Sequence, residues 1–162
     1  MSAAETIHAV CLVVGEAGIL IRGPAGSGKT TLAARLVEEA QRQGRFACWV
    51  ADDRVRLSAS GGRLVARPHP LIAGRMELRH AGIAVVRHEP AAVVALVVDL
   101  VDGPVARLPE APDQRVRLCG MALPRLACPV AAAPTLSLAG LAAARALAGQ
   151  SDERREIVAN AT

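Results

Sequence analysis

The chain has 162 residues, of which 52% are hydrophobic, and a formal net charge of +4. This length suits one domain with a sizeable core and is too short for two comfortable ones. We expect no membrane-spanning helix and, because residues 1–5 place no basic stretch ahead of an apolar segment, no secretory signal. With one Phe, one Trp and no Tyr, the chain lacks a platform for stacking bases, so nucleic acid is not the expected partner. The positive charge instead suits phosphates or an acidic protein.

The four cysteines are dispersed along the chain without a Cys-x-x-Cys pair. They are Cys11, Cys48, Cys119 and Cys128. Three of them stand in apolar surroundings, which favours buried reduced thiols over disulfides or zinc ligands. We therefore expect a cytoplasmic protein.

The first part of the chain predicts strand, turn, strand and helix in that order. Residues 6–14 and 19–21 have the apolar character of strands, and residues 15–18 form a tight turn between them. Residues 30–43 place apolar side chains on one helical face and charged side chains on the other, and Gly44 ends the helix.

The segment between the second strand and this helix fits the phosphate-binding pattern G-x-x-x-x-G-K-[ST] at every fixed position. Its residues are Gly23, Pro24, Ala25, Gly26, Ser27, Gly28, Lys29 and Thr30. The glycines let successive backbone amides point at a phosphate, and the helix adds its positive amino-terminal end. Lys29, the only lysine among 19 basic residues, is a compact ammonium that fits beside the terminal phosphates, and the Thr30 hydroxyl suits Mg²⁺. The segment predicts binding of a nucleoside triphosphate.

The remainder of the chain predicts short strands, one long buried strand and a second helix. The predicted strands are residues 46–51, 55–57, 63–66, 76–78, 83–86, 93–101, 116–118 and 121–126. The β-branched run at 93–101 is typical of a buried central strand, and residues 103–114 form an exposed loop rich in Pro and charge. Residues 136–147 predict a helix packed on the sheet. We expect an α/β fold with one domain over residues 1–150 and a polar tail over residues 151–162.

An acidic pair, Asp52 and Asp53, ends the strand at 46–51. Because the carboxyl ends of strands border the ligand crevice in an open α/β sheet, both carboxylates are expected to face the phosphates. One is suited to hold Mg²⁺ and the other to accept a proton from an incoming hydroxyl. An Asp pair at a strand end is often only a turn, but the neighbouring phosphate loop favours catalysis.

Three further residues have weaker indications. His8 stands at the start of an apolar strand, where a histidine is by itself more often structural than catalytic. Glu77 and Arg79 alternate along a short strand and share one face, which suits a carboxylate facing a metal and a guanidinium facing a phosphate. An ion pair on a solvated sheet face explains the same spacing equally well.

Taken in order, four segments resemble the bacterial HPr kinase/phosphorylase family: the strand with His8, residues 23–30, residues 51–55 and residues 76–83. The chain is most similar to the short alphaproteobacterial form without the N-terminal domain, over roughly residues 6–126. The resemblance implies a P-loop kinase domain related to phosphoenolpyruvate carboxykinase, with a central mixed sheet, a phosphate-loop helix and a C-terminal helix. It implies ATP- and Mg²⁺-dependent phosphorylation of a serine of HPr, the phosphocarrier of the phosphotransferase system. Many members also remove this phosphate by phosphorolysis, and well-studied members are hexamers.

The resemblance also implies roles for residues of this chain. It places His8 in the active site beside the acidic pair and makes one aspartate the general base for serine attack. We favour Asp52 as the base and Asp53 as its partner on the metal side or the His8 side. The expected catalytic residues are His8, Lys29, Asp52 and Asp53. The expected Mg²⁺ ligands are Thr30, Asp53 and Glu77. The expected nucleotide contacts are residues 23–30 and Arg79.

Three departures from the family pattern bear on the reverse reaction. His80 replaces the signature glycine after Arg79, which we expect to close a backbone conformation open to glycine. Longer relatives carry Lys-Pro-Gly-Arg-Asn where this chain has residues 130–134, so their arginine has no evident counterpart, and Arg125 is only a loose candidate. The loop at 103–114 is also shorter than in those relatives. These departures leave the kinase chemistry intact and count against phosphorolysis.

Two other functions fit parts of the sequence. One is a P-loop kinase that acts on a small molecule or on a different protein. The other is a regulatory module that binds ATP and a partner without transferring phosphate. The intact pair of Asp52 and Asp53 argues against such a sensor, because a sensor needs no general base.

Overall fold

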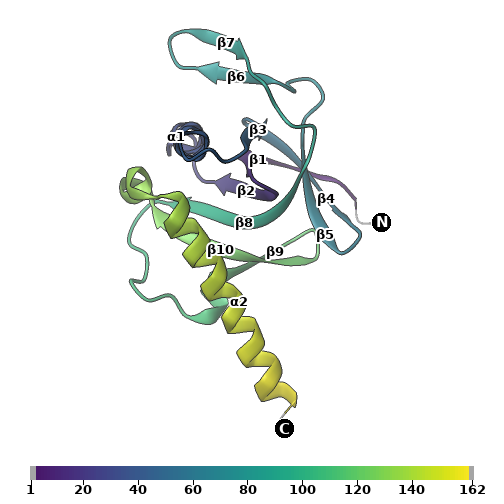
Figure 1. Cartoon of the computed structure of the whole chain (residues 1–162), viewed down its shortest axis with the longest axis vertical. Helices are drawn as coiled ribbons and strands as arrows, with labels where there is room; N and C mark the ends of the chain where they lie inside the picture. The colour runs from purple at the N-terminus through teal and green to yellow at the C-terminus, as the bar shows by residue number, and fades with distance from the viewer. Residues whose placement is uncertain (1–2, 161–162) are drawn as a thin grey trace.

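The computed structural model describes residues 3–160. In chain order its elements are β1 (Glu5–Val14), β2 (Ala17–Arg22), α1 (Lys29–Arg42), β3 (Ala47–Ala51), β4 (Arg54–Ser60), β5 (Arg63–Pro68), β6 (Arg75–Leu78), β7 (Gly82–Val85), β8 (Ala92–Val101), η1 (Ala111–Gln114), β9 (Arg115–Leu118), β10 (Met121–Pro129), η2 (Val130–Thr135) and α2 (Leu138–Asn160). Figure 1 shows these elements along the chain.

The strands other than β6 and β7 form a central mixed sheet, as the sequence predicts for an α/β fold. Strands β2, β8 and β10 are parallel, and β1 runs antiparallel between β2 and β3. The two longest strands each pair with two groups of neighbours. The start of β1 pairs with β4 and the start of β8 pairs with β5, whereas the later parts of both strands pair with β2.

The parallel strands bring their carboxyl ends to one edge of the sheet. The phosphate-loop segment follows β2 at this edge, and the acidic pair follows β3. In open α/β sheets this edge is where ligands bind. The topology therefore places the two motifs of the sequence side by side, although 22 residues separate Thr30 from Asp52.

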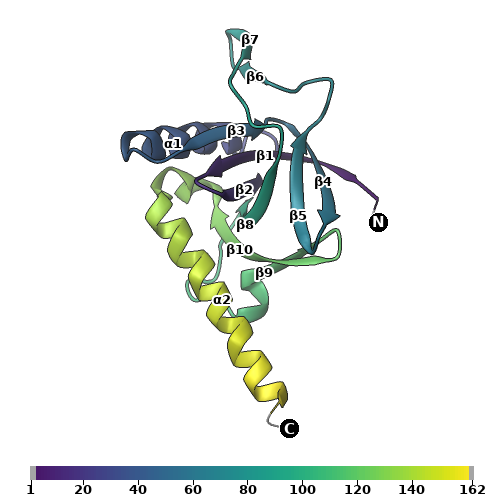
Figure 2. The same ribbon diagram turned by 45° about the vertical axis from the view of Figure 1, so that its right-hand side comes forward.

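The sheet is buried on both faces. On one face the two helices supply the core: Leu32, Leu36 and Val37 come from α1, and Leu138 and Leu141 come from α2. Figures 1 and 2 show both helices on this side. On the other face the core is supplied by strands of the same sheet, namely β4, β5 and the β9–β10 hairpin. Burial on both faces explains why β8 reads as an almost continuous apolar run.

Several elements differ from their sequence predictions at their ends; β4, for example, spans Arg54–Ser60 rather than residues 55–57. Strand β10 extends to Pro129, whereas the prediction ended at residue 126, and α2 spans Leu138–Asn160 rather than residues 136–147. The apolar periodicity of α2 stops near residue 147. The following residues are rich in Glu and Arg, however, and these have high helix propensity. No helix in the described part of the chain is both long and apolar enough to cross a membrane.

Strands β6 and β7 form a separate hairpin, called the arm below, that projects from the sheet in Figures 1 and 2. One hydrogen bond closes its base, and another joins the following segment to β3. The Val86 amide donates a hydrogen bond to the Gly74 carbonyl at 2.8 Å, and the Glu89 amide donates to the Trp49 carbonyl at 2.7 Å. The arm is thereby anchored next to the strand that carries the acidic pair.

Candidate active site

The phosphate loop enters α1 through a backbone that requires glycine. Gly28, the residue before the helix, has a φ of 92°, in the region that favours glycine. A β-carbon on Gly23 would stand 2.9 Å from the carbonyl oxygen of Leu100, so the loop packs directly on the end of β8. The first amides of α1 have no partner within the helix and, with the helix dipole, favour an anion.

The Lys29 side chain is enclosed by this loop. It is 7% exposed, and its Nζ donates hydrogen bonds to the carbonyls of Gly23 at 3.0 Å and Pro24 at 2.9 Å. Burial lowers the pKa of Lys29, and the nearby charges of Asp52 and Asp53 oppose that change. The ammonium is thus held by neutral carbonyls beside the helix terminus, where it is available to an incoming phosphate.

A second buried group in the loop is unsatisfied. The hydroxyl of Ser27 is buried and has no hydrogen-bond partner among the described residues. A buried polar atom without a partner is costly, and a ligand oxygen is one way to satisfy it. Together with the unpaired amides and Lys29, this hydroxyl makes the loop fit a phosphate group.

Asp52 faces the phosphate loop. The Thr30 hydroxyl donates a hydrogen bond to its Oδ1 at 2.8 Å. Burial raises the pKa of the Asp52 carboxyl, and hydrogen bonds from Thr30 and from the backbone amides of Glu77 and Asp53 oppose that rise. A hydroxyl and a carboxylate that converge beside the loop lysine are the protein groups that hold Mg²⁺ in P-loop enzymes.

Asp53 faces the other way, towards β1. Its Oδ1 lies 2.9 Å from Nδ1 of His8, and both side chains are at least half exposed. The backbone of Asp53 has a φ of 68°, an uncommon left-handed conformation that Asp tolerates better than most residues. The Ala9 amide fixes this turn by donating to the Asp53 carbonyl at 3.2 Å. The left-handed residue thus divides the acidic pair between two partners.

The arm contributes Glu77 and Arg79 at the edge of the site. Glu77 is exposed and touches Asp52 through its backbone amide. Strand β6 ends at Leu78, as the predicted strand at 76–78 does, so Arg79 lies in the turn of the arm and does not share a strand face with Glu77 as the alternation suggested. Its guanidinium reaches the phosphate loop, with Nη2 3.5 Å from where a β-carbon on Gly26 would stand.

The expectation that His80 closes the glycine-like conformation is wrong. His80 has a φ of 64°, so the backbone takes the left-handed path with histidine in place. His is among the residues that occupy this region more readily than others. Histidine at this position therefore does not exclude the left-handed conformation.

The predicted metal ligands do not form a closed cluster. Thr30 contacts Asp52, Asp53 contacts His8, and within residues 3–160 no three carboxylate, imidazole or thiol groups converge to hold a metal ion. Mg²⁺ usually binds one or two carboxylates and completes its shell with substrate phosphates and water. Thr30 and Asp52 fit that requirement.

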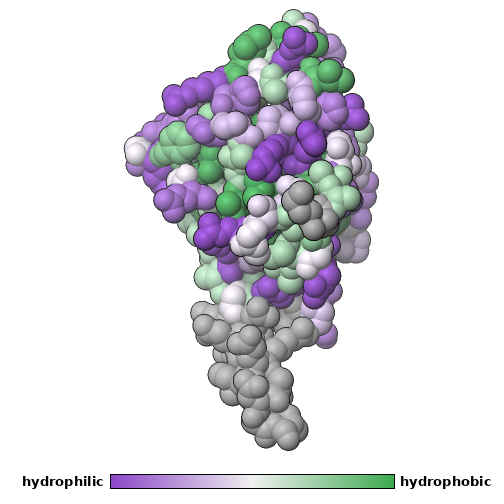
Figure 3. Space-filling view, turned by 90° about the vertical axis from the view of Figure 1, so that its right-hand side faces the viewer, coloured by the Kyte–Doolittle hydropathy of each residue, from purple (hydrophilic) through white to green (hydrophobic). Residues whose placement is uncertain are grey.

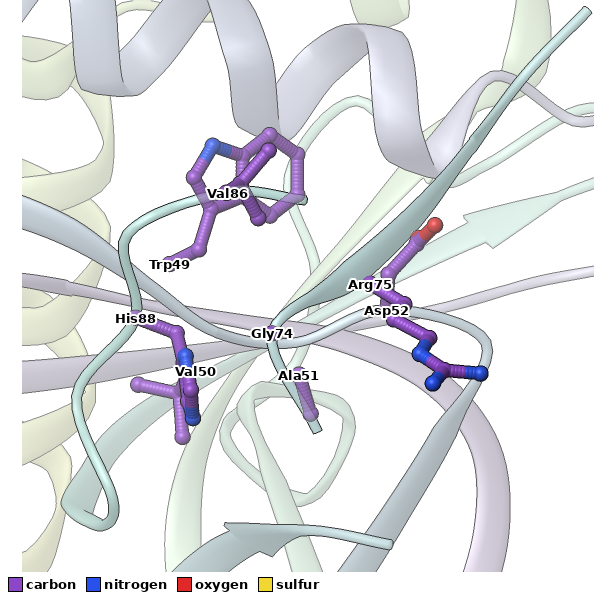
Figure 4. A pocket seen from close by; sticks show the side chains of 8 residues that line it. All are labelled: Trp49, Val50, Ala51, Asp52, Gly74, Arg75, Val86 and His88. Atoms are coloured by element: carbon purple, nitrogen blue, oxygen red, sulfur yellow. The ribbon is translucent and has the colours of Figure 1, made fainter. Parts of the chain in front are cut away.

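A small hollow lies behind Asp52, between β3 and the base of the arm. Its lining residues are Trp49, Val50, Ala51, Asp52, Gly74, Arg75, Val86 and His88. In Figure 4, Trp49 and Val86 lie at one end of the hollow, and Asp52 and Arg75 lie at the other. The hollow therefore lies between Asp52 and the base of the arm.

One ionic network in this region was missed by the sequence analysis. Asp99 on β8 is 7% exposed and accepts two hydrogen bonds from Arg22, each at 2.7 Å, and one from Arg125. Burial acts to raise the pKa of Asp99, but the two guanidinium groups prevail and lower it. Arg22 is the residue before Gly23, so the network fixes the entrance to the phosphate loop. The lone charge within the apolar run at 93–101 was the indication available in the sequence.

This combination of parallel strands within a mixed sheet, a glycine loop and a buried lysine at a helix terminus defines a P-loop α/β protein. The sequence model of the family described as HPr Serine kinase C-terminal domain matches residues 1–153. The chain belongs to this family.

Curated relatives named HPr kinase/phosphorylase agree with this result. The HPr kinase/phosphorylase of Neisseria meningitidis serogroup C is 33% identical over 110 residues, which cover 63% of this chain and 32% of that protein. The enzyme of the same name from Clostridium beijerinckii is 35% identical over 77 residues, covering 48% of this chain and 24% of that protein. The chain thus matches about a third or less of the length of these curated relatives.

A solved structure shares the fold. The Hpr(Ser) kinase/phosphatase from Coxiella burnetii aligns with a TM-score of 0.63 and 24% sequence identity, over 77% of this chain and 79% of that chain. The similarity supports the predicted architecture of a P-loop kinase domain with a central mixed sheet and a C-terminal helix.

Proposed function

We propose that this protein is an ATP- and Mg²⁺-dependent kinase that phosphorylates a serine of the phosphocarrier HPr. The observation that carries the proposal is the division of the acidic pair, with Asp52 bound to Thr30 beside the phosphate loop and Asp53 bound to His8. Phosphoryl transfer needs a metal-holding carboxylate and a second group that accepts the proton of the attacking hydroxyl. The two partners supply separate positions for these two tasks.

The contacts favour Asp53 as the general base, the reverse of our preference from the sequence. Thr30 and Asp52 are placed to hold Mg²⁺, whose charge would offset that of the β- and γ-phosphates. Asp53 is exposed, so a serine of another protein is able to reach it, and His8 orients its carboxylate. Asp53 takes the serine proton as the serine oxygen bonds to the γ-phosphorus and the bond from phosphorus to the β-phosphate oxygen breaks.

Lys29, the amides of α1 and Arg79 serve the nucleotide in this proposal. Lys29 and the amides neutralise charge on the transferred group, a contribution that grows as the charge spreads in the transition state. Arg79 is placed by the arm against Gly26 and closes the loop from outside. The backbone amide of Glu77 donates a hydrogen bond to Asp52. We keep the Glu77 carboxylate as a ligand for Mg²⁺ once phosphates are bound.

The proposal includes phosphorolysis of phosphorylated HPr. His80 keeps the left-handed turn of the arm, which removes the first of the three sequence objections. By microscopic reversibility, Asp53 returns the proton to the serine oxygen in the reverse direction. A hexameric assembly is part of the proposal on the strength of the family resemblance.

Incubation of the protein with radiolabelled ATP, Mg²⁺ and HPr from the same organism, followed by mapping of the labelled residue, tests the proposal. Label on one HPr serine is expected from the wild type, and release of pyrophosphate is expected when phosphorylated HPr meets inorganic phosphate. Nucleotide binding without transfer to HPr would favour the sensor. Transfer to metabolites with HPr ignored would favour a small-molecule kinase.

A further inference from the structure

The outer face of the sheet formed by β1, β4 and β5 is strongly basic. Alternation along β4 and β5 buries Val55, Leu57, Leu64 and Ala66 and turns their neighbours outward. The outward basic residues are His8, Arg54, Arg56, Arg63 and Arg67. We call these five residues the basic face. The side of the molecule shown in Figure 3 includes β4 and β5; hydrophilic and hydrophobic residues are interspersed over its middle, and several hydrophobic residues lie at the top with the arm.

His8 is paired with Asp53, but the arginines that face each other across β4 and β5 have no carboxylate partner among the described residues. Arg56 stands directly opposite Arg67 in the register of β4 and β5, and like charges in that position destabilise a sheet. Arg67 donates a hydrogen bond to the Ser58 hydroxyl at 3.2 Å. Arg56 forms no ion pair with any residue that the structure describes, and no Asp or Glu points outward from these three strands. The free protein therefore carries an unfavourable arrangement that an acidic partner would relieve.

The basic face begins at the site of proton transfer. His8 pairs with Arg54 across β1 and β4, and the same His8 contacts Asp53, the residue before Arg54. A strand rises about 3.4 Å per residue, so Arg56 stands about 7 Å beyond Arg54 on the same face. A protein whose serine reaches Asp53 must lie next to these arginines.

We propose that the basic face docks an acidic surface of the acceptor protein around its serine. The inference rests on the proposed kinase function and adds the chemistry by which the protein acceptor is recognised. Complementary charge of this kind raises the rate of encounter and the specificity more than it changes the chemical step. Nucleic acid is the poorer fit, because the basic face carries no Phe, Tyr or Trp on which a base can stack.

Steady-state transfer to HPr in the double variant Arg56→Gln/Arg67→Gln tests the proposal. We expect kcat/KM for HPr to fall about tenfold at low salt, within the range of electrostatic steering, through a higher KM with kcat unchanged. The loss should shrink as salt is added, because salt screens exposed charges. The matched control is Arg42→Gln/Arg45→Gln, at the far end of α1 from the phosphate loop, which should leave both constants unchanged.

An unchanged KM in a variant that still transfers phosphate would overturn the docking inference alone. A wild-type protein that transfers nothing to HPr would refute the proposed function and the inference that depends on it. The two failures are therefore distinct, because the second appears before any substitution is made.

Footprinting of the wild type keeps the inference testable if the double variant does not fold. Phenylglyoxal modifies arginine, and mass spectrometry reports the rate at each position. HPr with a non-hydrolysable ATP analogue should slow modification of Arg56 and Arg67 and leave Arg45 unchanged. Protection by the single-stranded RNA poly(U), with none by HPr, would overturn the proposal in favour of a nucleic-acid site.

Discussion

The phosphate loop and the basic face differ in the burial and the partners of their positive charges. Lys29 is buried, fixed by two carbonyls and close to two carboxylates, whereas Arg56 is exposed and faces another arginine. A buried, oriented charge acts on the energy of the transition state, because solvent does not screen it. An exposed charge is screened and acts mainly on encounter. Removing the buried charge should therefore lower kcat, whereas removing the exposed charges should raise KM for the acceptor protein.

The largest effect is expected from Lys29→Ala. Loss of the cation that we propose neutralises the transferred phosphate should lower kcat by about 10³- to 10⁵-fold, the range known for an arginine in that role. The thermal unfolding transition should remain cooperative, because the partners of Lys29 are backbone carbonyls that water can satisfy. Turnover near the wild-type rate in this variant would remove Lys29 from the mechanism.

The next largest effect is expected from Asp53→Asn. Removing the proposed general base should lower kcat by about 10²- to 10⁴-fold while the affinity for ATP and Mg²⁺ is kept. Asp52→Asn is the matched comparison, since it should weaken Mg²⁺-dependent nucleotide binding measured by calorimetry. If Asp52→Asn kept full metal affinity and Asp53→Asn lost it, the two roles would be exchanged.

Asp99→Asn should affect stability. It leaves the partly buried guanidinium groups of Arg22 and Arg125 without their carboxylate, a loss of about 3–5 kcal/mol in the free energy of unfolding measured with urea. The exposed Asp102→Asn is the control and should change it by less than about 0.5 kcal/mol.

The Asp99 network also predicts a pH dependence. Because folding lowers the pKa of Asp99 from its usual 3.8, its contribution is present at neutral pH and is lost as the pH falls below that value. The difference between wild type and Asp99→Asn should shrink in acid. A difference that stayed constant there would contradict the assigned direction of the shift.

The smallest effect on stability is expected from Arg56→Gln alone. Relief of the repulsion with Arg67 should leave the free energy of unfolding unchanged or raise it by up to about 0.5 kcal/mol. The same variant is expected to bind its acceptor less well. A protein that becomes no less stable and yet less efficient with HPr would show that the charge serves an encounter, whereas a marked loss of stability would show that it serves the fold.

The parts of the site that the sequence predicts are those encoded over short distances. The phosphate loop is a continuous pattern, and its neighbouring strand and helix follow from local periodicity. The position of Asp52 beside Thr30 also follows, because a strand end and a loop meet at one edge of a parallel sheet.

The parts that the sequence analysis missed depend on single backbone conformations and distant pairing. The left-handed turn at Asp53 determines which carboxylate faces the loop, and no local sequence pattern predicts this turn. Arg22 and Asp99 are 77 residues apart, so their contact follows only from the register of β2 and β8. At His80 the error was different: we expected that only glycine would adopt the left-handed conformation, but histidine adopts it there.

The hollow behind the acidic pair gives the protein a natural optical probe. Trp49 is the only tryptophan, and the chain has no tyrosine, so red-edge excitation reports one ring. That ring shares the hollow with Asp52 and with Arg75 of the arm. Its emission therefore records movements of the arm against β3, and stopped-flow mixing of unlabelled protein with nucleotide gives their rates.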